Sequence, residues 1–177
     1  WDGCNGEPAK VEVYARAAQV ELFINGKSVG KKKVKKCRAN FNTTYQDGEI
    51  TAVSYDENGR EINRYSLQTA GKETVLQVRP EEKTVKPEGL AFIQLQYTDS
   101  KGIWKPMEKH NIKVTVENGV LKGLGSPAPY VKGNYTDHTV ATYYGEAMAV
   151  VQADGNGPVK VTVADEERFY VAEIPCE

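Results

Sequence analysis

The side chains best suited to ligand chemistry in this 177-residue sequence are aromatic residues in irregular stretches of its second half. One tryptophan and four tyrosines make up this set: Trp104, Tyr130, Tyr135, Tyr143 and Tyr144. Aromatic faces stack on the apolar faces of sugar rings, so these residues are candidates for contact with a carbohydrate. The same side chains could instead fill the core and loop bases of a β-fold, and we favour that structural interpretation.

Residues that could catalyse a reaction are harder to assemble. The 24 Asp and Glu residues fall mostly in turns or on polar strand faces. Glycoside hydrolysis needs two carboxylates about 5–9.5 Å apart, and a barrel enzyme needs about 250 residues. No G-x-S-x-G nucleophile elbow at a strand-to-helix turn is indicated, and His110 and His138 lie in loop-like surroundings that are typical of surface residues. We therefore expect no catalytic residue in this chain.

Metal and cofactor sites are not indicated by the sequence either. Cys4, Cys37 and Cys176 are widely spaced, and two histidines are too few for a zinc-like cluster. The acidic turn at residues 56–59 lacks the other ligands of a calcium loop, and the glycines of residues 123–126 do not fit a phosphate-binding loop. We expect no metal, no cofactor and three free thiols; one disulfide with one cysteine left over stays open.

The most charged stretch runs from Lys31 to Arg38 and contains five lysines. It could be a patch that binds nucleic acid or another polyanion. It could also be the solvated edge of a sheet, where lysines prevent strand-to-strand aggregation. No aromatic residue lies among the lysines, and the net charge of the chain is −1. We therefore favour the edge strand and expect no nucleic-acid partner.

Strands must position all of these residues, because the chain alternates apolar and polar residues and shows no convincing amphipathic helix. The clearest signal is Val20–Gly30, where an alternating run meets Asn25-Gly26, the pair typical of a type I′ hairpin. The stretch from Gly119 to Glu146 is the least regular. Turn signals recur every ~8–12 residues, which is typical of immunoglobulin-like antiparallel β-sandwiches. Further strands are expected over 11–15, 41–45, 49–55, 61–69, 91–97, 112–117 and 159–163, and from residue 74.

The length allows one or two domains, and the small residues at 70–72 are a suitable seam. We expect a linker over residues 1–9, a first immunoglobulin-like sandwich over 10–71 and a second over 72–177. Hydrophobic residues make up 40% and charged residues 27%, as in ordinary globular domains. No apolar run approaches the ~18 residues of a membrane-spanning helix. The start, W-D-G-C-N-G, has no initiator Met, so we expect a piece of a longer protein.

Several phrases of the first half together resemble a known domain. They are V-E-V-Y-A-R-A-A-Q-V-E-L-F-I-N-G-K-S-V-G (11–30), G-E-I-T-A-V-S-Y-D-E-N-G-R-E-I (48–62) and T-A-G (69–71). They are similar to the small β-sandwich that follows the catalytic barrel in many bacterial glycoside hydrolase family 2 enzymes, typically β-galactosidases. Trp1 and the G-E-P near residue 7 fit the segment that leads into it.

The second half continues the resemblance, toward the immunoglobulin-like domain that comes next in those enzymes. Its phrases are L-A-F-I-Q-L-Q-Y-T-D-S-K-G (90–102), V-E-N-G-V-L-K-G-L-G-S (116–126) and A-M-A-V-V-Q-A (147–153). At Gly125-Ser126-Pro127 relatives commonly read G-N-G-D-P, so no role of that loop's Asn and Asp is carried over. The family's catalytic glutamates lie on the barrel, and no stretch here matches their motifs.

The resemblance implies non-catalytic accessory domains of a β-galactosidase-type exo-glycosidase. It also implies that the partner is the catalytic barrel of the same parent chain, and that the location is periplasmic or extracellular. Two other functions stay open. The chain could be a carbohydrate-binding module that contacts a glycan, or the immunoglobulin-like stalk of a bacterial surface protein. The sequence upstream of Trp1 would separate a barrel enzyme from a stalk.

Overall fold

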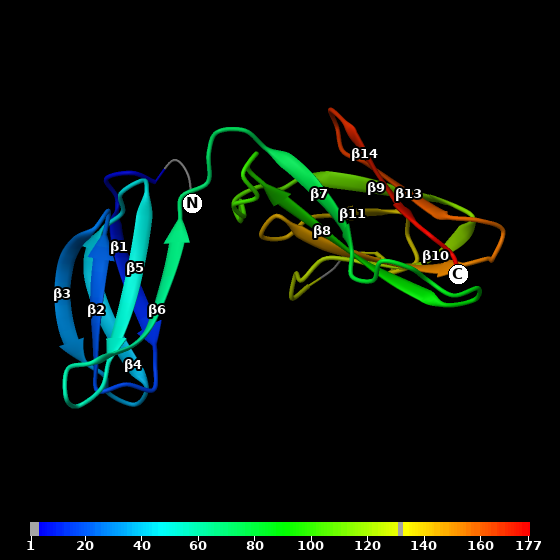
Figure 1. Cartoon of the computed structure of the whole chain (residues 1–177). Coiled ribbons are helices and arrows are strands. Elements are labelled where there is room, and N and C mark those ends of the chain that lie inside the picture. The colour runs from blue at the N-terminus through cyan, green and yellow to red at the C-terminus, as the bar shows by residue number, and fades with distance from the viewer. Residues whose placement is uncertain (1–3, 131–132) are drawn as a thin grey trace. The chain divides into compact units, whose positions relative to one another are not determined.

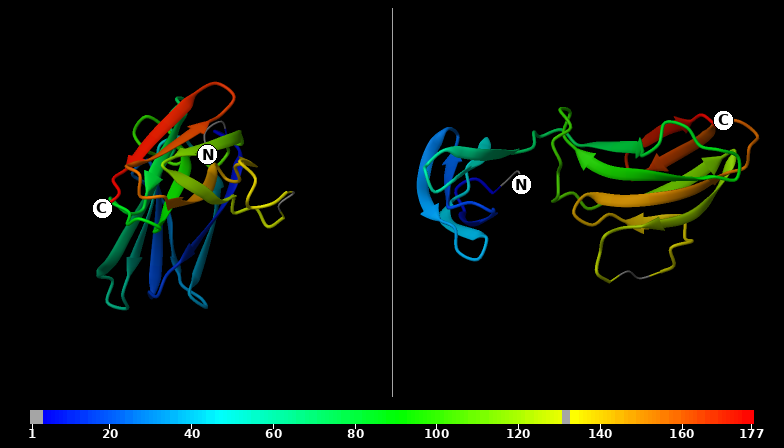
Figure 2. Two further views of the ribbon diagram at one scale, coloured as in Figure 1. Left: turned by 90° about the vertical axis from the view of Figure 1, so that its right-hand side faces the viewer. Right: turned by 60° about the horizontal axis from the view of Figure 1, so that its bottom comes forward.

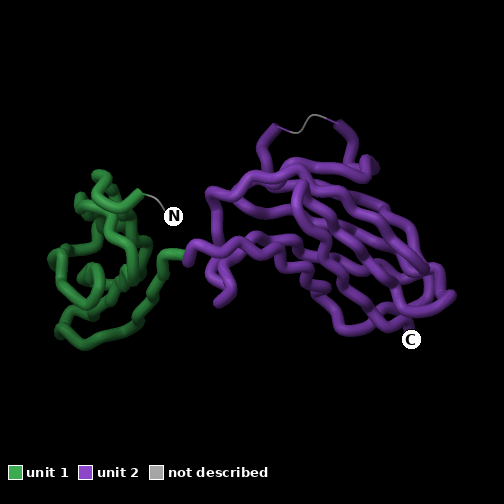
Figure 3. Tube along the Cα trace, turned by 90° about the horizontal axis from the view of Figure 1, so that it is seen from above, with its two compact units in different colours: residues 1–70 green, residues 71–177 purple. Residues whose placement is uncertain are grey.

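The computed structural model of the chain describes residues 4–130 and 133–177 (Figure 1). The regular elements in these ranges are all β-strands, and the strands pair antiparallel throughout the four sheets. The predicted all-β class is therefore confirmed. The described ranges contain no helix that is long and apolar enough to cross a membrane. The chain divides into two compact units, residues 1–70 and 71–177, which Figure 3 colours separately.

The first unit packs a four-stranded sheet against a two-stranded one. Its strands are β1 (Pro8–Tyr14), β2 (Gln19–Ile24), β3 (Lys27–Lys33), β4 (Arg38–Thr44), β5 (Glu49–Tyr55) and β6 (Glu61–Gln68). The larger sheet has the order β3-β2-β5-β6, and β1 pairs with β4. Val20 and Leu22 of β2 form a buried cluster with Ala39 and Phe41 of β4, so the core lies between the sheets. Strand β1 begins at Pro8, within the predicted linker, and residues 1–3, including Trp1, lie outside the described residues.

The predicted Asn-Gly hairpin joins β2 to β3. Asn25 and Gly26 have φ of 49° and 76°, in the left-handed region that both central residues of a type I′ turn require. The Asn25 side chain also accepts a 2.8 Å hydrogen bond from the Glu49 amide, which ties the hairpin to the start of β5. Strand β3, with its lysines, lies at the edge of the sheet. Both the hairpin and the edge position are confirmed.

The second unit is a sandwich of two four-stranded sheets. Its strands are β7 (Val75–Pro80), β8 (Leu90–Thr98), β9 (Asn111–Glu117), β10 (Gly119–Gly125), β11 (Thr139–Ala141), β12 (Glu146–Ala153), β13 (Val159–Ala164) and β14 (Phe169–Ile174). The sheet orders are β10-β12-β8-β7 and β11-β9-β13-β14. The layers face each other in Figure 2, and their inward residues, among them Ile93, Val114, Ala149 and Val161, form one buried core.

The stretch expected to be irregular, Gly119 to Glu146, contains more structure than its sequence indicates. It holds β10 and β11, and β12 begins at its end. Strand β10 carries three glycines and a bulge between Leu121 and Gly123, and both features hide the two-residue period. Pairing with β12 nevertheless holds β10 extended, because tertiary context overrides a weak local preference for strand.

Candidate functional site

Three of the five predicted aromatic residues come together at one end of the second unit. The indole Nε1 of Trp104 donates a 2.9 Å hydrogen bond to the carbonyl oxygen of Tyr144. The rings of Tyr143 and Tyr144 lie edge to face, with centroids 4.5 Å apart. Trp104 and Tyr144 remain 42% and 55% exposed, so their faces are open to a ligand. These residues are the aromatic cluster of the site.

A strained turn presents this cluster. Tyr143 and Glu146 exchange two backbone hydrogen bonds of 3.1 Å around Tyr144 and Gly145, whose φ are 51° and 71°. A left-handed tyrosine is unusual, and the neighbouring position accepts only glycine, because a Cβ there would meet the Lys105 carbonyl oxygen at 2.5 Å. The close backbone approach and the indole hydrogen bond therefore fix Tyr144 in an otherwise unfavourable conformation.

A buried polar network around Lys105 lies beside the turn at residues 143–146. Lys105 is 2% exposed, and its Nζ lies 3.1 Å from Oε1 of Glu108 and 2.8 Å from Oγ1 of Thr74. The other oxygen of Glu108 lies 2.8 Å from Nε2 of His110, whose ring stacks on Tyr97 with centroids 4.5 Å apart. His110 is thus half-buried in a structural network and is not the surface histidine that its loop-like surroundings predict.

The carboxylates around this network titrate at lower pH than ordinary side chains. Burial works to raise the pKa of Glu108, but hydrogen bonds from His110, Lys105 and Thr74 together hold that pKa below its usual value. Burial also works to raise the pKa of Asp165, and it is outweighed by hydrogen bonds from two backbone amides and from the Tyr97 hydroxyl. Both groups therefore stay ionised and act as structural anions at neutral pH.

Tyr135 forms a second exposed aromatic face, on the outer side of the sheet β10-β12-β8-β7. Its ring lies on the backbone of Gly125, where a Cβ would meet Cε1 of Tyr135 at 2.8 Å. Its carbonyl oxygen accepts a 2.6 Å hydrogen bond from the Leu124 amide, so β10 holds Tyr135 in place. Tyr135 is 64% exposed. The Tyr135 ring, which packs on the Gly125 backbone, is therefore available to a ligand. We call this ring the aromatic platform.

A groove of about 520 Å³ runs beside this platform, within the size range of ligand sites. Residues on the outer face of the sheet line it, among them Gln94 of β8 and, opposite it, Met148 of β12, together with Glu146. Gln96 is not part of the lining but lies opposite Glu146. Gln96 Nε2 donates a 2.7 Å hydrogen bond to Oε1 of Glu146. Sugar hydroxyls need such amide and carboxylate partners, and the Gln94 amide has no protein partner among the described residues.

The structure does not bring every predicted residue together. Tyr130 is 93% exposed and does not line the groove. Gln94, Gln96 and Glu146 were not among the predicted site residues. The alternation of β8 puts both glutamines on one solvent face, and that pattern could have pointed to them. No three metal-ligating side chains gather among the described residues, and Cys4, Cys37 and Cys176 are free thiols.

Both units are β-sandwiches, and exposed aromatic side chains lie at turns and on a sheet face. This architecture is that of the tandem β-sandwich class of proteins. The comparisons with known proteins then give the family. "Glycoside hydrolase family 2 C-terminal domain 5" matches residues 76–168, which is more than half of the chain and lies within the second unit. A domain of unknown function, DUF4982, matches residues 6–63 within the first unit. The chain belongs to glycoside hydrolase family 2.

Relatives agree with this assignment. The chain is 28% identical over 171 residues to the β-galactosidase BoGH2A of Bacteroides ovatus, a match that covers 93% of this chain and 20% of that protein. A family 2 member from Bacteroides cellulosilyticus superposes with a TM-score of 0.91 at 26% identity, over 100% of this chain and 24% of that one. A β-glycosidase from Bacteroides vulgatus shares the fold, with a TM-score of 0.85 at 22% identity over 99% of this chain and 23% of that one.

The chain thus spans about a fifth of the β-galactosidase and about a quarter of each solved structure. It corresponds to the C-terminal, accessory part of the family, and the resemblance read from the sequence is confirmed. The prediction that it contacts sugar through its aromatic residues is a separate matter and stays a prediction.

Proposed function

We propose that this chain supplies the C-terminal accessory domains of a β-galactosidase-type exo-glycosidase, where it stabilises or orients the catalytic barrel of the same parent chain. The observation that carries this proposal is the match to the Bacteroides ovatus β-galactosidase along 93% of the chain. Each of the two sandwiches has a buried core of its own, which suits a compact accessory domain. We further propose a periplasmic or extracellular location, which rests on the family resemblance alone and is tested by cell fractionation.

The test compares the longer protein with a version that lacks these 177 residues. Nitrophenyl β-galactoside is the substrate, and nitrophenyl β-glucuronide is the control for the sugar. We expect the full protein to hydrolyse the galactoside, and the shortened one to lose activity and thermal stability. Hydrolysis by the isolated 177-residue chain would overturn the accessory role, and a full protein that cleaves only the glucuronide would overturn the substrate class.

A second candidate function is carbohydrate binding by the groove of the second unit. The observation that favours it is Tyr135, which is 64% exposed and held on Gly125 beside the unpartnered Gln94 amide. Calorimetric titration with β-galacto-oligosaccharides tests it. Tyr135→Ala should abolish binding, whereas Tyr130→Ala should leave it unchanged because Tyr130 lies outside the groove. Flat titrations with the unmodified chain reject this function.

A further inference from the structure

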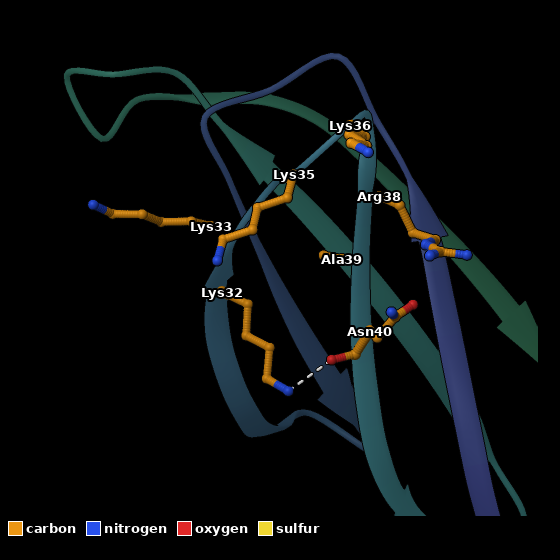
Figure 4. Close-up of a pocket in the computed structure, with 7 residues that line it drawn as sticks. All are labelled: Lys32, Lys33, Lys35, Lys36, Arg38, Ala39 and Asn40. Atoms are coloured by element: carbon orange, nitrogen blue, oxygen red, sulfur yellow. Dashed lines mark hydrogen bonds between the residues drawn. The ribbon is translucent and has the colours of Figure 1, made fainter.

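A cleft in the first unit gathers positive charge from two strands. It has a volume of about 640 Å³ and lies between the end of β3 and the start of β4 (Figure 4). These strands belong to different sheets, so the cleft opens at the side of the sandwich. We call it the basic cleft; its lining is Lys32, Lys33, Lys35, Lys36, Arg38, Ala39 and Asn40.

The charges of the basic cleft are largely unneutralised. Its lining contains five cationic side chains and no carboxylate. Arg38 lies 3.7 Å from Glu12, and Lys32 Nζ donates a 2.6 Å hydrogen bond to the Asn40 carbonyl oxygen. The ammonium groups of the other three lysines have neither an ion pair nor a hydrogen bond to any described residue. Five like charges around one hollow create a positive potential that attracts anions.

The backbone of the cleft departs from local preference. Lys36 and Cys37 have φ of 50° and 59°, and Lys35 and Arg38 close the turn around them with hydrogen bonds of 2.9 and 3.1 Å. The Asn25-Gly26 hairpin of the same unit adopts the same two-residue geometry, and its two residues are the ones that favour this turn. Here a lysine and a cysteine occupy strained positions. Such departures from local preference are concentrated at functional sites.

Protection of a sheet edge explains only part of this arrangement. Lysines on β3 are sufficient to blunt its exposed edge. Edge protection requires neither the strained lysine of the turn nor the additional cation, Arg38, that β4 contributes. We propose that the basic cleft binds an anionic polysaccharide, through carboxylate or sulfate groups on successive sugars. The choice of a polysaccharide over nucleic acid rests on the proposed function, and on a cleft lining that has no aromatic side chain to stack on bases.

Binding of the 177-residue chain to immobilised polymers tests the proposal. Polygalacturonate and dextran sulfate are the anionic probes, neutral dextran is the blank, and a single-stranded oligonucleotide tests the rival polyanion. The triple variant Lys33→Gln, Lys35→Gln, Lys36→Gln should bind at least tenfold more weakly. The control triple variant changes three exposed lysines of the second unit to Gln, at Lys83, Lys86 and Lys109, and should bind within twofold of the unmodified chain.

Saturable binding to at least one anionic polysaccharide, weakened by added salt and by the cleft variant alone, supports the proposal. Equal losses in both triple variants would show attraction by general charge and overturn it. Tighter binding to the oligonucleotide, or no binding to either anionic polymer at low salt, would also overturn it. Hydrolysis of nitrophenyl galactoside by the longer protein is scored separately, so failure here is distinguishable from failure of the proposed accessory function.

A second variant tests the contribution of the turn itself. Lys36→Asn with Cys37→Gly places the favoured pair in the turn, so the first unit should unfold at a higher temperature while affinity for the anionic polymer falls severalfold. Greater stability together with undiminished affinity would show that Lys36 has no part in binding, and would overturn the role of the turn in the proposal.

Discussion

The indole of Trp104 lies within hydrogen-bonding distance of the Tyr144 carbonyl, 2.9 Å from nitrogen to oxygen, across 40 residues of sequence. This bond restrains a tyrosine in the left-handed region, with φ of 51°. The aromatic cluster is therefore a consequence of backbone geometry, and changes to either partner should have different effects.

Trp104→Phe keeps an aromatic ring and removes the donor. We expect the second unit to lose about 1 kcal/mol of unfolding free energy, the usual net contribution of one hydrogen bond. Tyr144→Asn keeps the carbonyl acceptor and places a residue that tolerates the left-handed region, so it should leave stability unchanged or slightly raise it. Calorimetric unfolding of the two variants checks this, and equal destabilisation of both would contradict it.

Gly145→Ala should be far more harmful than Gly102→Ala. Both glycines have left-handed φ, 71° and 83°, so each alanine costs about 1 kcal/mol in backbone strain. At Gly145 the new Cβ would also lie 2.5 Å from the Lys105 carbonyl oxygen, whereas at Gly102 the nearest atom is 4.0 Å away. We expect a further loss of about 2 kcal/mol at Gly145. Urea unfolding midpoints measure the difference, and similar midpoints would refute the close approach.

Lys105→Met should destabilise the second unit by about 2–3 kcal/mol. The change removes a buried cation from Glu108 and Thr74 and leaves their oxygens without it. The loss stays below the largest values for broken buried pairs, because Glu108 keeps His110 and partial exposure to water. Lys109→Met, at an exposed neighbour, should change stability by less than about 0.5 kcal/mol. Indistinguishable unfolding curves would argue against the network.

Acid should destabilise the second unit through Asp99, Glu108 and Asp165. Burial works to raise the pKa of Asp99, but the amides of Gly71, Ile103 and Lys101 hold that pKa below its usual value. A carboxyl with a lowered pKa in the folded state contributes stability above its unfolded pKa, about 4, and loses it as the pH falls through the folded pKa. The unfolding temperature should therefore be level from pH 7 to 5 and fall below about 4.

Asp99→Asn provides the control for this pH profile. It should cost about 1–3 kcal/mol at neutral pH, because a charged acceptor of three amides is replaced by a neutral one. The acid-induced loss should then be smaller than in the unmodified chain, since one titrating carboxyl is gone. An unchanged acid slope would show that Asp99 does not contribute to it.

Local sequence predicted the parts of the fold that local rules control. The inward residues of β8, β9 and β13 alternate cleanly, and Asn25-Gly26 specifies its own turn. Strand β10 was not predicted, because Gly119, Gly123 and Gly125 disfavour strands. Only its pairing with β12 explains its extended conformation. The aromatic candidates could be chosen by residue type. Contacts distant in sequence decide which of them gather, as between Trp104 and Tyr144, or between Tyr135 and Gly125.

The contacts between β10 and Tyr135 have a consequence for solubility. Strand β10 is the outermost strand of its sheet, and such a strand can recruit a strand from another molecule. The Leu124 amide is already bonded to the Tyr135 carbonyl, and the tyrosine ring covers the bare backbone at Gly125. Tyr135 therefore occupies part of the edge on which a foreign strand would pair, and a shortened chain that lacks this residue would favour the formation of intermolecular sheet during storage or refolding.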